Sequence, residues 1–389
     1  MAPQQNAATL SPCASQVKTK CSNQNRKIGL KKLHEIEQLA GKIHEHCAET
    51  QTQLIIDLGS GLGYLSEALF KLRNNYLILG LEADEQRVES ARKRCQKFLP
   101  QEALNSISYK KEFIKADANS RARIEGYASK LAQSHGMLPG LDTAIIGLHA
   151  CADLSISAMI LFLTMPQVRS LHIMPCCYHK LALRSENDTM TSTTSPFVNF
   201  PLSNGLRNAI SAATSVGCFN RPFMRLACQE TSSRWRKDSF AHADHGRQMY
   251  MRALANALCD VEELVKVKVC SKPALLSLED RDSFNELQQR YQLYSQQTGN
   301  PLDWRHVHEE RFIQIGKRYS DGRGCRLAEA LCCLQTSMQK LCENLVLYDR
   351  LCFLKDAAAG QQLQLEVRYE KLFDEQISPR CHVLIAKKL

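Results

Sequence analysis

The first half of the chain alternates between short apolar runs and longer stretches with helical spacing. The apolar runs are typical of strands that are buried on both faces of a sheet. They predict strands over residues 53–58, 76–81, 107–114, 141–148 and 168–174. Apolar residues at three- and four-residue spacing predict helices over residues 30–48, 65–72, 85–99, 121–134 and 153–163. This alternation predicts an α/β fold with a doubly wound, mostly parallel sheet.

The second half of the chain has a different pattern. Residues 203–356 are mostly helical in spacing, and two β-rich stretches follow at 362–373 and 382–388. We therefore expect a core over 28–202, a helical insertion over 203–356, and strands within 357–389 that complete the sheet. Residues 1–27 are polar and without periodicity, so we expect them to be disordered. We also expect a mobile loop in the Ser- and Thr-rich segment Leu183–Ser195.

Composition places the chain among soluble globular proteins. Hydrophobic residues make up 44% and charged residues 23% of the sequence. Its apolar runs are far shorter than the roughly 18 residues that cross a bilayer, so we expect no membrane association. The 17 cysteines are scattered and include no Cys-x-x-Cys pair. We interpret them as reduced thiols of a cytoplasmic or nuclear protein and expect no bound metal.

The charge bears on the choice of partner. The formal net charge is +10, with basic clusters at 26–32, 87–97 and 221–237. A basic surface favours nucleic acid, although solvated helix faces explain each cluster equally well. Oligomeric state is not indicated by the sequence.

The motif Asp57-Leu-Gly59-Ser-Gly61-Leu-Gly63 follows the first predicted strand. Alternate glycines allow a tight turn and a close approach of the backbone to a ligand. The following helix directs its positive end to the same place. A dinucleotide site would have its third glycine at position 64, which is Tyr64 here. The pattern instead matches the loop with which methyltransferases hold S-adenosylmethionine, in which Asp57 faces the amino group of the methionine part.

Two further acidic residues end strands in the order that this cofactor requires. Glu82 ends the second predicted strand, where a carboxylate accepts hydrogen bonds from ribose hydroxyls. Asp117 follows the third and is placed to bind the adenine amino group. Alone, each carboxylate is more simply explained as a surface residue.

The fourth strand ends in Gly147-Leu-His149-Ala-Cys151-Ala-Asp153. Open parallel sheets bind ligands at the carboxyl ends of their strands. His149 is therefore a candidate base and Asp153 a candidate orienting carboxylate, with Cys151 between them to position the acceptor. The alternative is that Asp153 caps the next helix while the other two side chains only pack.

The fifth strand ends in Cys176-Cys177-Tyr178-His179 at the same rim. Cys176 and Cys177 are candidates for positioning a substrate, and Tyr178 and His179 for handling its proton. A zinc site that includes Cys151 is conceivable, but the spacing fits no common zinc motif, and substrate positioning is the favoured interpretation.

Together with several rarer segments, these motifs resemble the methyltransferase-like 25 family. The order of the segments is that of the family from about residue 28 to the end of the chain. The segments are Lys31-Lys32-x-His34-Glu35-Ile36, Asp57–Gly63, Gly147–Ser155, Cys176–Leu181, Phe200–Ser203, Leu347–Leu351, Phe373-Asp374 and Ser378–Arg380. A more distant likeness is to tRNA acceptor-stem 2′-O-methyltransferases. The resemblance implies a Rossmann-like domain that binds S-adenosylmethionine.

Three departures from the family pattern stand out. Only about 27 residues precede the Lys-Lys-x-His-Glu segment, where members usually have a long region. Ala152 stands where glycine is usual, and Leu62 replaces a commonly polar residue. None of the three removes an expected contact with the cofactor.

The sequence thus predicts a methyltransferase that uses S-adenosylmethionine. RNA is the favoured acceptor and a protein side chain the next. Adenine N6-methylation is disfavoured because the fourth strand is not followed by the Asn/Asp-Pro-Pro-aromatic segment of adenine dimethylases. The alternatives are a non-catalytic scaffold that keeps the cofactor site and a nicotinamide-dependent oxidoreductase, which Tyr64 disfavours.

Overall fold

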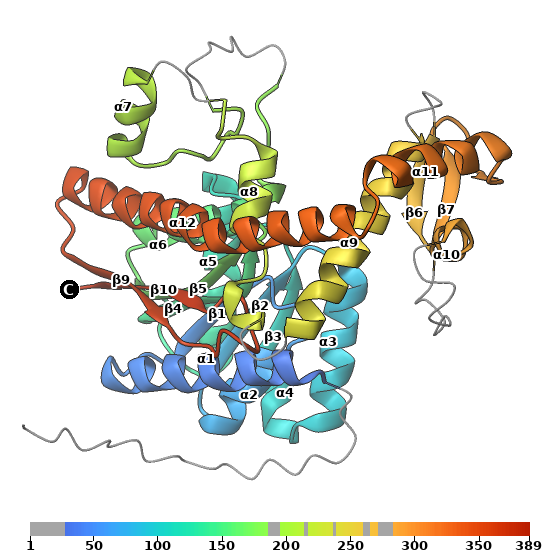
Figure 1. The fold of residues 1–389 in the computed structure, drawn as a ribbon. Helices are drawn as coiled ribbons and strands as arrows, with labels where there is room; N and C mark the ends of the chain where they lie inside the picture. Colours follow the sequence, from blue (N-terminus) through green and yellow to red (C-terminus); the bar gives the residue numbers. More distant parts are fainter. Residues whose placement is uncertain (1–27, 186–194, 214–216, 236–238, 260–264, 271–282) are drawn as a thin grey trace, which may run out of the picture.

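The structure is a computed structural model, and it describes residues 28–185, 195–213, 217–235, 239–259, 265–270 and 283–389 (Figure 1). A seven-stranded sheet with the order β3-β2-β1-β4-β5-β10-β9 forms its centre. Strands β1 to β5 are parallel, whereas β10 is antiparallel to both β5 and β9. The doubly wound, mostly parallel fold predicted from the sequence is therefore confirmed. The expected disordered segment 1–27 and most of the expected mobile loop, 186–194, lie outside the described residues.

The strands of the central sheet are short and mostly buried. They are β1 (Leu54–Leu58), β2 (Leu77–Glu82), β3 (Ile107–Lys111), β4 (Thr143–Cys151), β5 (Val168–Cys176), β9 (Leu365–Lys371) and β10 (His382–Lys388). The helices of this part are α1 (Leu30–Glu49), α2 (Tyr64–Leu72), α3 (Glu85–Phe98), α4 (Gln101–Ser106), α5 (Ala118–Gln133), α6 (Asp153–Thr164), α7 (Asn204–Ala212), α8 (Arg221–Ala227) and α12 (Arg323–Gly360). Two short 3-10 helices are η1 (Tyr178–Lys180) and η2 (Ser232–Trp235). Within the described ranges, no helix is both long and apolar enough to cross a membrane.

Alternate residues of each strand face opposite layers of helices. In β1, Leu54, Ile56 and Leu58 pack into the apolar cluster formed with α5, α6 and α12. Ile55 packs into the cluster formed with α1, α2 and α3 on the other face. Because strand side chains alternate, one apolar run can supply both cores of a three-layer sandwich.

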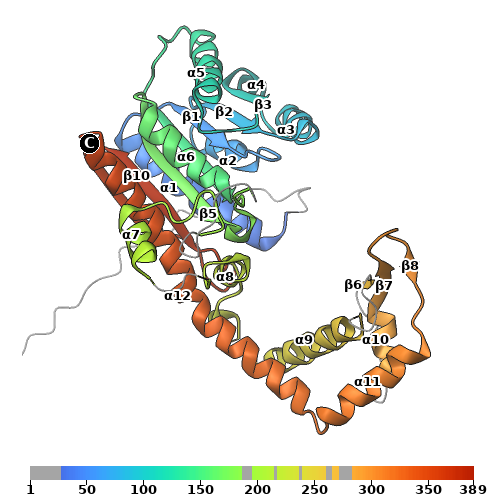
Figure 2. The ribbon, with the colours of Figure 1, turned by 90° about the horizontal axis from the view of Figure 1, so that it is seen from above.

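A smaller body stands apart from the sheet in both ribbon views (Figures 1 and 2). It contains the antiparallel strands β6 (Val265–Val269), β7 (Tyr291–Ser295) and β8 (Pro301–Leu302). Helices α10 (Phe284–Arg290) and α11 (His306–Arg318) and part of α9 (Ser239–Cys259) pack on it. It has its own apolar cluster, centred on Met251, Leu258 and Leu287. We call this body the satellite; its strands were not anticipated within the region expected to be helical.

The long helix α12 links the satellite to the core. Its C-terminal half packs on the sheet through Cys342, Val346, Leu347 and Leu354. Its N-terminal half runs beside α9 toward the satellite (Figure 2). Because α12 continues to Gly360, the boundary expected at residue 356 falls inside a helix.

Two buried histidines join α1 to the central sheet. His46 on α1 and His172 on β5 are 3% and 0% exposed, and their Nδ1 and Nε2 atoms lie 2.6 Å apart. Burial lowers the pKa of His172, and the charges of His46 and Lys387 lower it further. Burial also lowers the pKa of His46. The folded protein therefore holds a pair of neutral imidazoles that hydrogen bond to each other.

This pair should make the fold sensitive to acid. Below the unfolded pKa of about 6.5, the unfolded chain takes up protons that the folded chain refuses, so the free energy of unfolding falls as the pH falls. We expect His172→Gln, which can still hydrogen bond but does not titrate, to flatten this decline between pH 7 and 5 in thermal unfolding. The matched control is His306→Gln at an exposed histidine of α11. A decline in His172→Gln as steep as in the wild type would contradict the assignment.

Candidate functional site

The glycine loop between β1 and α2 has a left-handed backbone. Gly59, Gly61 and Gly63 have φ values of +71°, +57° and +75°. A Cβ at residue 63 would lie 2.3 Å from the hydroxyl of Tyr109 on β3, so that position is closed to side chains. The glycines are thus required by the turn and by its close packing, as expected from the sequence.

Glu82 is held by backbone amides at the end of β2. Its carboxylate accepts hydrogen bonds from the amides of Gly61 at 3.0 Å, Ala83 at 3.0 Å and Asp84 at 3.2 Å. Glu82 is 8% exposed and lines a cavity. A carboxylate fixed in this way is preorganised to accept further hydrogen bonds from a ligand, because an ionised carboxylate has about four acceptor positions.

Asp57 lies beneath the loop and does not line the cavity. It is 2% exposed and accepts a hydrogen bond of 2.9 Å from the hydroxyl of Ser66 on α2. Burial raises the pKa of Asp57 to about 7, against the lowering effect of the Ser66 bond. This carboxylate therefore holds the start of α2 against β1.

The cavity lies at the carboxyl ends of the parallel strands and has a volume of about 490 Å³. One side is formed by Gly59 and Glu82, and another by residues 112–116, which follow β3. The start of α6 closes it with Cys151–Leu154 and with Ile156 and Ile160. This volume is within the usual range for small-molecule sites, and the mixture of apolar walls with a few fixed polar groups is typical of them.

Asp117 is not brought into this cavity. It is exposed, and its carboxylate caps α5 by accepting a bond of 2.7 Å from the amide of Ser120. The segment just before it lines the cavity instead, and Glu112 there is paired with Arg123 of α5 at 2.6 Å. The sequence analysis missed Glu112, because a carboxylate in a polar stretch gives no periodic signal.

His149 is oriented by a buried carboxylate from α1, the first of the described helices. Its Nε2 lies 3.0 Å from Glu35 of α1, whose second oxygen accepts a bond of 2.6 Å from Ser378. Burial alone would raise the pKa of Glu35, but the bonds from His149 and Ser378 bring it below its ordinary value. His149 itself remains 40% exposed. Glu35 belongs to the Lys-Lys-x-His-Glu segment, yet its partner could not be read from the sequence.

Asp153 forms hydrogen bonds to two residues of the chain that follows β5. Its two oxygens accept bonds from the amide of Ala182 at 3.0 Å and from the side chain of Asn199 at 2.8 Å. Both Asp153 and Asn199 line the cavity. Asp153 is the first residue of α6, after Ala152, so it ties α6 to the chain after β5, with Asn199 as a partner that the sequence analysis missed.

Tyr178 and His179 are adjacent in sequence but differ in environment. Tyr178 is fully buried, with its hydroxyl 3.2 Å from the carbonyl of Pro175 and the Arg350 guanidinium 4.9 Å from its ring centre. Like His149 and His179, Tyr178 does not line the cavity, but unlike them it is fully buried, so the structure gives it a packing role in place of the expected proton transfer. His179 is partly exposed, and burial lowers its pKa, with Arg225 and Lys180 contributing in the same direction.

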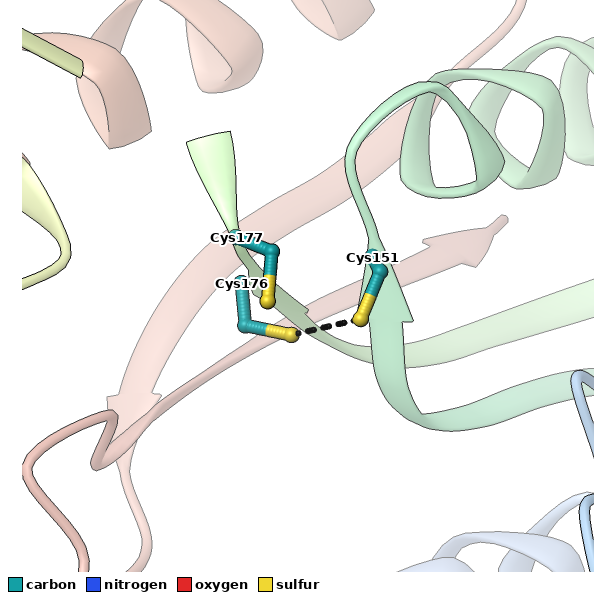
Figure 3. Close-up of side chains that lie close together, drawn as sticks. All are labelled: Cys151, Cys176 and Cys177. Carbon is teal, nitrogen blue, oxygen red and sulfur yellow. Dashed lines mark hydrogen bonds between the residues drawn. The ribbon is translucent and has the colours of Figure 1, made fainter. Parts of the chain in front are cut away.

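The three candidate cysteines at the rim come together (Figure 3). Cys151 ends β4 and Cys176 ends β5, and their sulfur atoms lie 3.2 Å apart. The sulfur of Cys177 joins them, so that all three lie within 4.8 Å of one another. Hydrogen bonding to Cys151 and Cys176 holds the pKa of the Cys177 thiol well below its usual range, whereas the corresponding bonds raise that of Cys176.

Backbone strain is concentrated at this rim. His149, Ala152 and Cys177 have φ values of +61°, +48° and +52°. At Ala152, ψ is −125°, a conformation open mainly to glycine. The sequence departs from the family pattern at this position, so the chain keeps the turn at a steric cost.

We expect Ala152→Gly to raise the free energy of unfolding by about 1 kcal/mol because it relieves this strain. The matched control is Ala150→Gly, two residues earlier on β4. It should lower the free energy of unfolding by about 1 kcal/mol, since it removes a buried methyl group and glycine loses more backbone entropy on folding. Chemical denaturation measures both. Destabilisation by both substitutions would show that Ala152 is not strained.

Comparisons with known proteins agree with this geometry. Residues 31–184 match the family model described as a methyltransferase domain. Probable methyltransferase-like protein 25 of Mus musculus is 24% identical over 275 residues, or 70% of this chain and 42% of that protein. The protein of the same name from Homo sapiens is 22% identical over 277 residues, again 70% of this chain and 42% of that protein. The chain thus spans less than half the length of these curated relatives.

Solved structures of methyltransferases are also similar. The methyltransferase domain of bacterial CtHen1 matches with a TM-score of 0.27 and 18% identity, over 36% of this chain and 65% of that chain. The resemblance to the methyltransferase-like 25 family, inferred from short segments, is confirmed by matches to these relatives over 70% of the chain. Residues 31–184 of the core thus match a methyltransferase domain.

Proposed function

We propose that this chain binds S-adenosylmethionine in the cavity beside the glycine loop and transfers its methyl group to RNA. The observation that carries the proposal is the pairing of the left-handed loop Gly59–Gly63 with the amide-held carboxylate of Glu82 on one cavity wall. In this arrangement the loop receives the methionine part, Glu82 the ribose, and the apolar walls the adenine. The methyltransferase domain over residues 31–184 supports it.

Bound S-adenosylmethionine supplies an electrophilic methyl group, so the protein has to place an acceptor in line and remove its proton. His149 is suited to this work because Glu35 fixes its ring while leaving it partly exposed. His179 is a second candidate, since its lowered pKa keeps it neutral near pH 7. Asp153 holds the side chain of Asn199 at the cavity wall, where both residues can contact the acceptor.

RNA is favoured as acceptor by the positive charge around His179. Lys180, Arg221 and Arg225 are exposed around His179, and Arg221 donates a hydrogen bond to the His179 carbonyl. Lys115 adds a further cation where residues 112–116 line the cavity. Exposed cations beside a small-molecule site favour a polyanion whose phosphates they neutralise.

The first test is calorimetric titration with S-adenosylmethionine of the wild type, Glu82→Gln and Glu85→Gln. Glu82→Gln removes a charged acceptor of ribose bonds, so its Kd should rise about tenfold to a hundredfold. Glu85→Gln removes the same charge three residues later, at an exposed position paired with Lys111, and should leave Kd unchanged. Thermal unfolding of both variants controls for loss of the fold. No binding by the wild type at millimolar cofactor would overturn the proposal.

The acceptor is tested by the salt dependence of RNA binding and by transfer of labelled methyl groups to RNA and protein fractions. Losing one phosphate contact should lower the slope of log Kd against log salt by about 0.7 to 0.9. We expect this decrease for Arg225→Gln but not for Arg318→Gln on the satellite, which is also exposed. Label in protein alone would replace RNA with a protein side chain. Cofactor binding without transfer to either fraction would favour the scaffold.

A further inference from the structure

We propose that Cys151, Cys176 and Cys177 bind one Zn²⁺ ion at the rim of the cavity, with the fourth coordination position left to an exchangeable ligand. This site departs from the expectation of no metal. It goes beyond the proposed function and does not depend on it: Cys151 lines the same cavity, but the three thiols can bind a metal whether or not the cofactor binds.

The distances between the sulfur atoms suit a metal. Zn²⁺ binds thiolate sulfur at about 2.3 Å in tetrahedral geometry, which separates two sulfur ligands by about 3.8 Å. In the structure, Cys151 and Cys176 are 3.2 Å apart and the full set lies within 4.8 Å. The required separation falls between these values, so small side-chain adjustments complete the site. Thiolate ligands also select Zn²⁺ over hard cations such as Mg²⁺.

Two irregularities of the backbone bring the three thiols to one point. Successive side chains of a strand point to opposite faces, so Cys176 and Cys177 should diverge. The left-handed conformation of Cys177, with φ of +52°, turns its sulfur back to the side of Cys176 (Figure 3). On β4, the register shift between Gly147 and Ala150 places Cys151 directly opposite Cys176. Such strain is tolerated where it serves a site.

The fourth position is open among the described residues, because no further His, Cys, Asp or Glu joins the set. Cys151 lines the cavity, so an exchangeable ligand would reach the ion from that side. Three thiolates and one Zn²⁺ carry a net charge of −1, and Lys180 lies close enough to act on both Cys151 and Cys177. Three protein ligands with one open position are typical of zinc that binds water or a substrate atom and lowers its pKa.

The experiment measures metal binding directly, without cofactor. The wild type, Cys176→Ser, Cys177→Ser and Cys218→Ser are purified with a phosphine reductant, stripped with chelator and titrated with Zn²⁺ against a colorimetric competitor. Co²⁺ then serves as a spectroscopic stand-in, since its thiolate charge-transfer absorption grows with the number of sulfur ligands. Cys218 is exposed and lies outside the set, so it is the matched control.

We expect one Zn²⁺ per chain in the wild type and in Cys218→Ser. Affinity should fall at least tenfold in Cys176→Ser and Cys177→Ser, with about a third less charge-transfer absorption in each. Unchanged thermal unfolding shows that a variant keeps its fold. Absence of stoichiometric metal in the wild type would overturn the proposal. Equal Zn²⁺ binding by all four proteins would overturn it as well.

Discussion

The buried carboxylate of Glu35 is the constraint on which the site depends. A carboxylate removed from water is unfavourable by several kcal/mol unless its oxygens are bonded. Here, one oxygen is bonded to His149 on β4 and the other to Ser378 in the tail between β9 and β10. The same carboxylate therefore holds α1 on the sheet, fixes the connection between β9 and β10, and orients His149. Residues at opposite ends of the chain meet at this carboxylate.

A second buried carboxylate, Asp349, fixes the backbone that follows the cavity-lining residue Asn199. On α12, it accepts bonds from the amides of Leu202 and Ser203 at 2.8 and 2.9 Å and from the Ser203 hydroxyl at 2.6 Å. Asp153 thus holds the chain at Asn199, and Asp349 holds it again three residues later, at Leu202. The helix that reaches the satellite therefore also holds the residues that follow Asn199, which lines the cavity. Structural and functional segments share the same residues, which explains why the short resembling motifs are dispersed along the chain.

Much of the fold was predictable because strands buried on both faces, such as Leu54–Leu58, need continuous apolar runs. The loop glycines and Glu82 were predictable because the backbone of a strand-turn-helix limits which residues fit. The satellite strands were not, since Val265–Val269 alternates Val with Lys over only five residues inside a helical region. Tyr178 was misjudged because a turn after a strand can point its side chain either way. The three cysteines were placed at one rim by the sequence because parallel strands end at the same edge of a sheet. The distances between their sulfur atoms were not predictable, since the left-handed turn at Cys177 and the register shift before Cys151 have no sequence signal.

The pairing of α9 with the N-terminal half of α12 sets how the satellite relates to the core. A helix of 38 residues spans about 57 Å and turns by about 100° per residue. Deleting one residue from the exposed part of α12 would shorten the helix by only about 1.5 Å. It would, however, rotate the attached satellite by about 100° around the helix axis. Because α9 would not rotate with it, the side chains of α12 that now face α9 would turn away from that helix. Length changes in one helix are therefore tolerable only with matching changes in the other, or in steps close to whole turns.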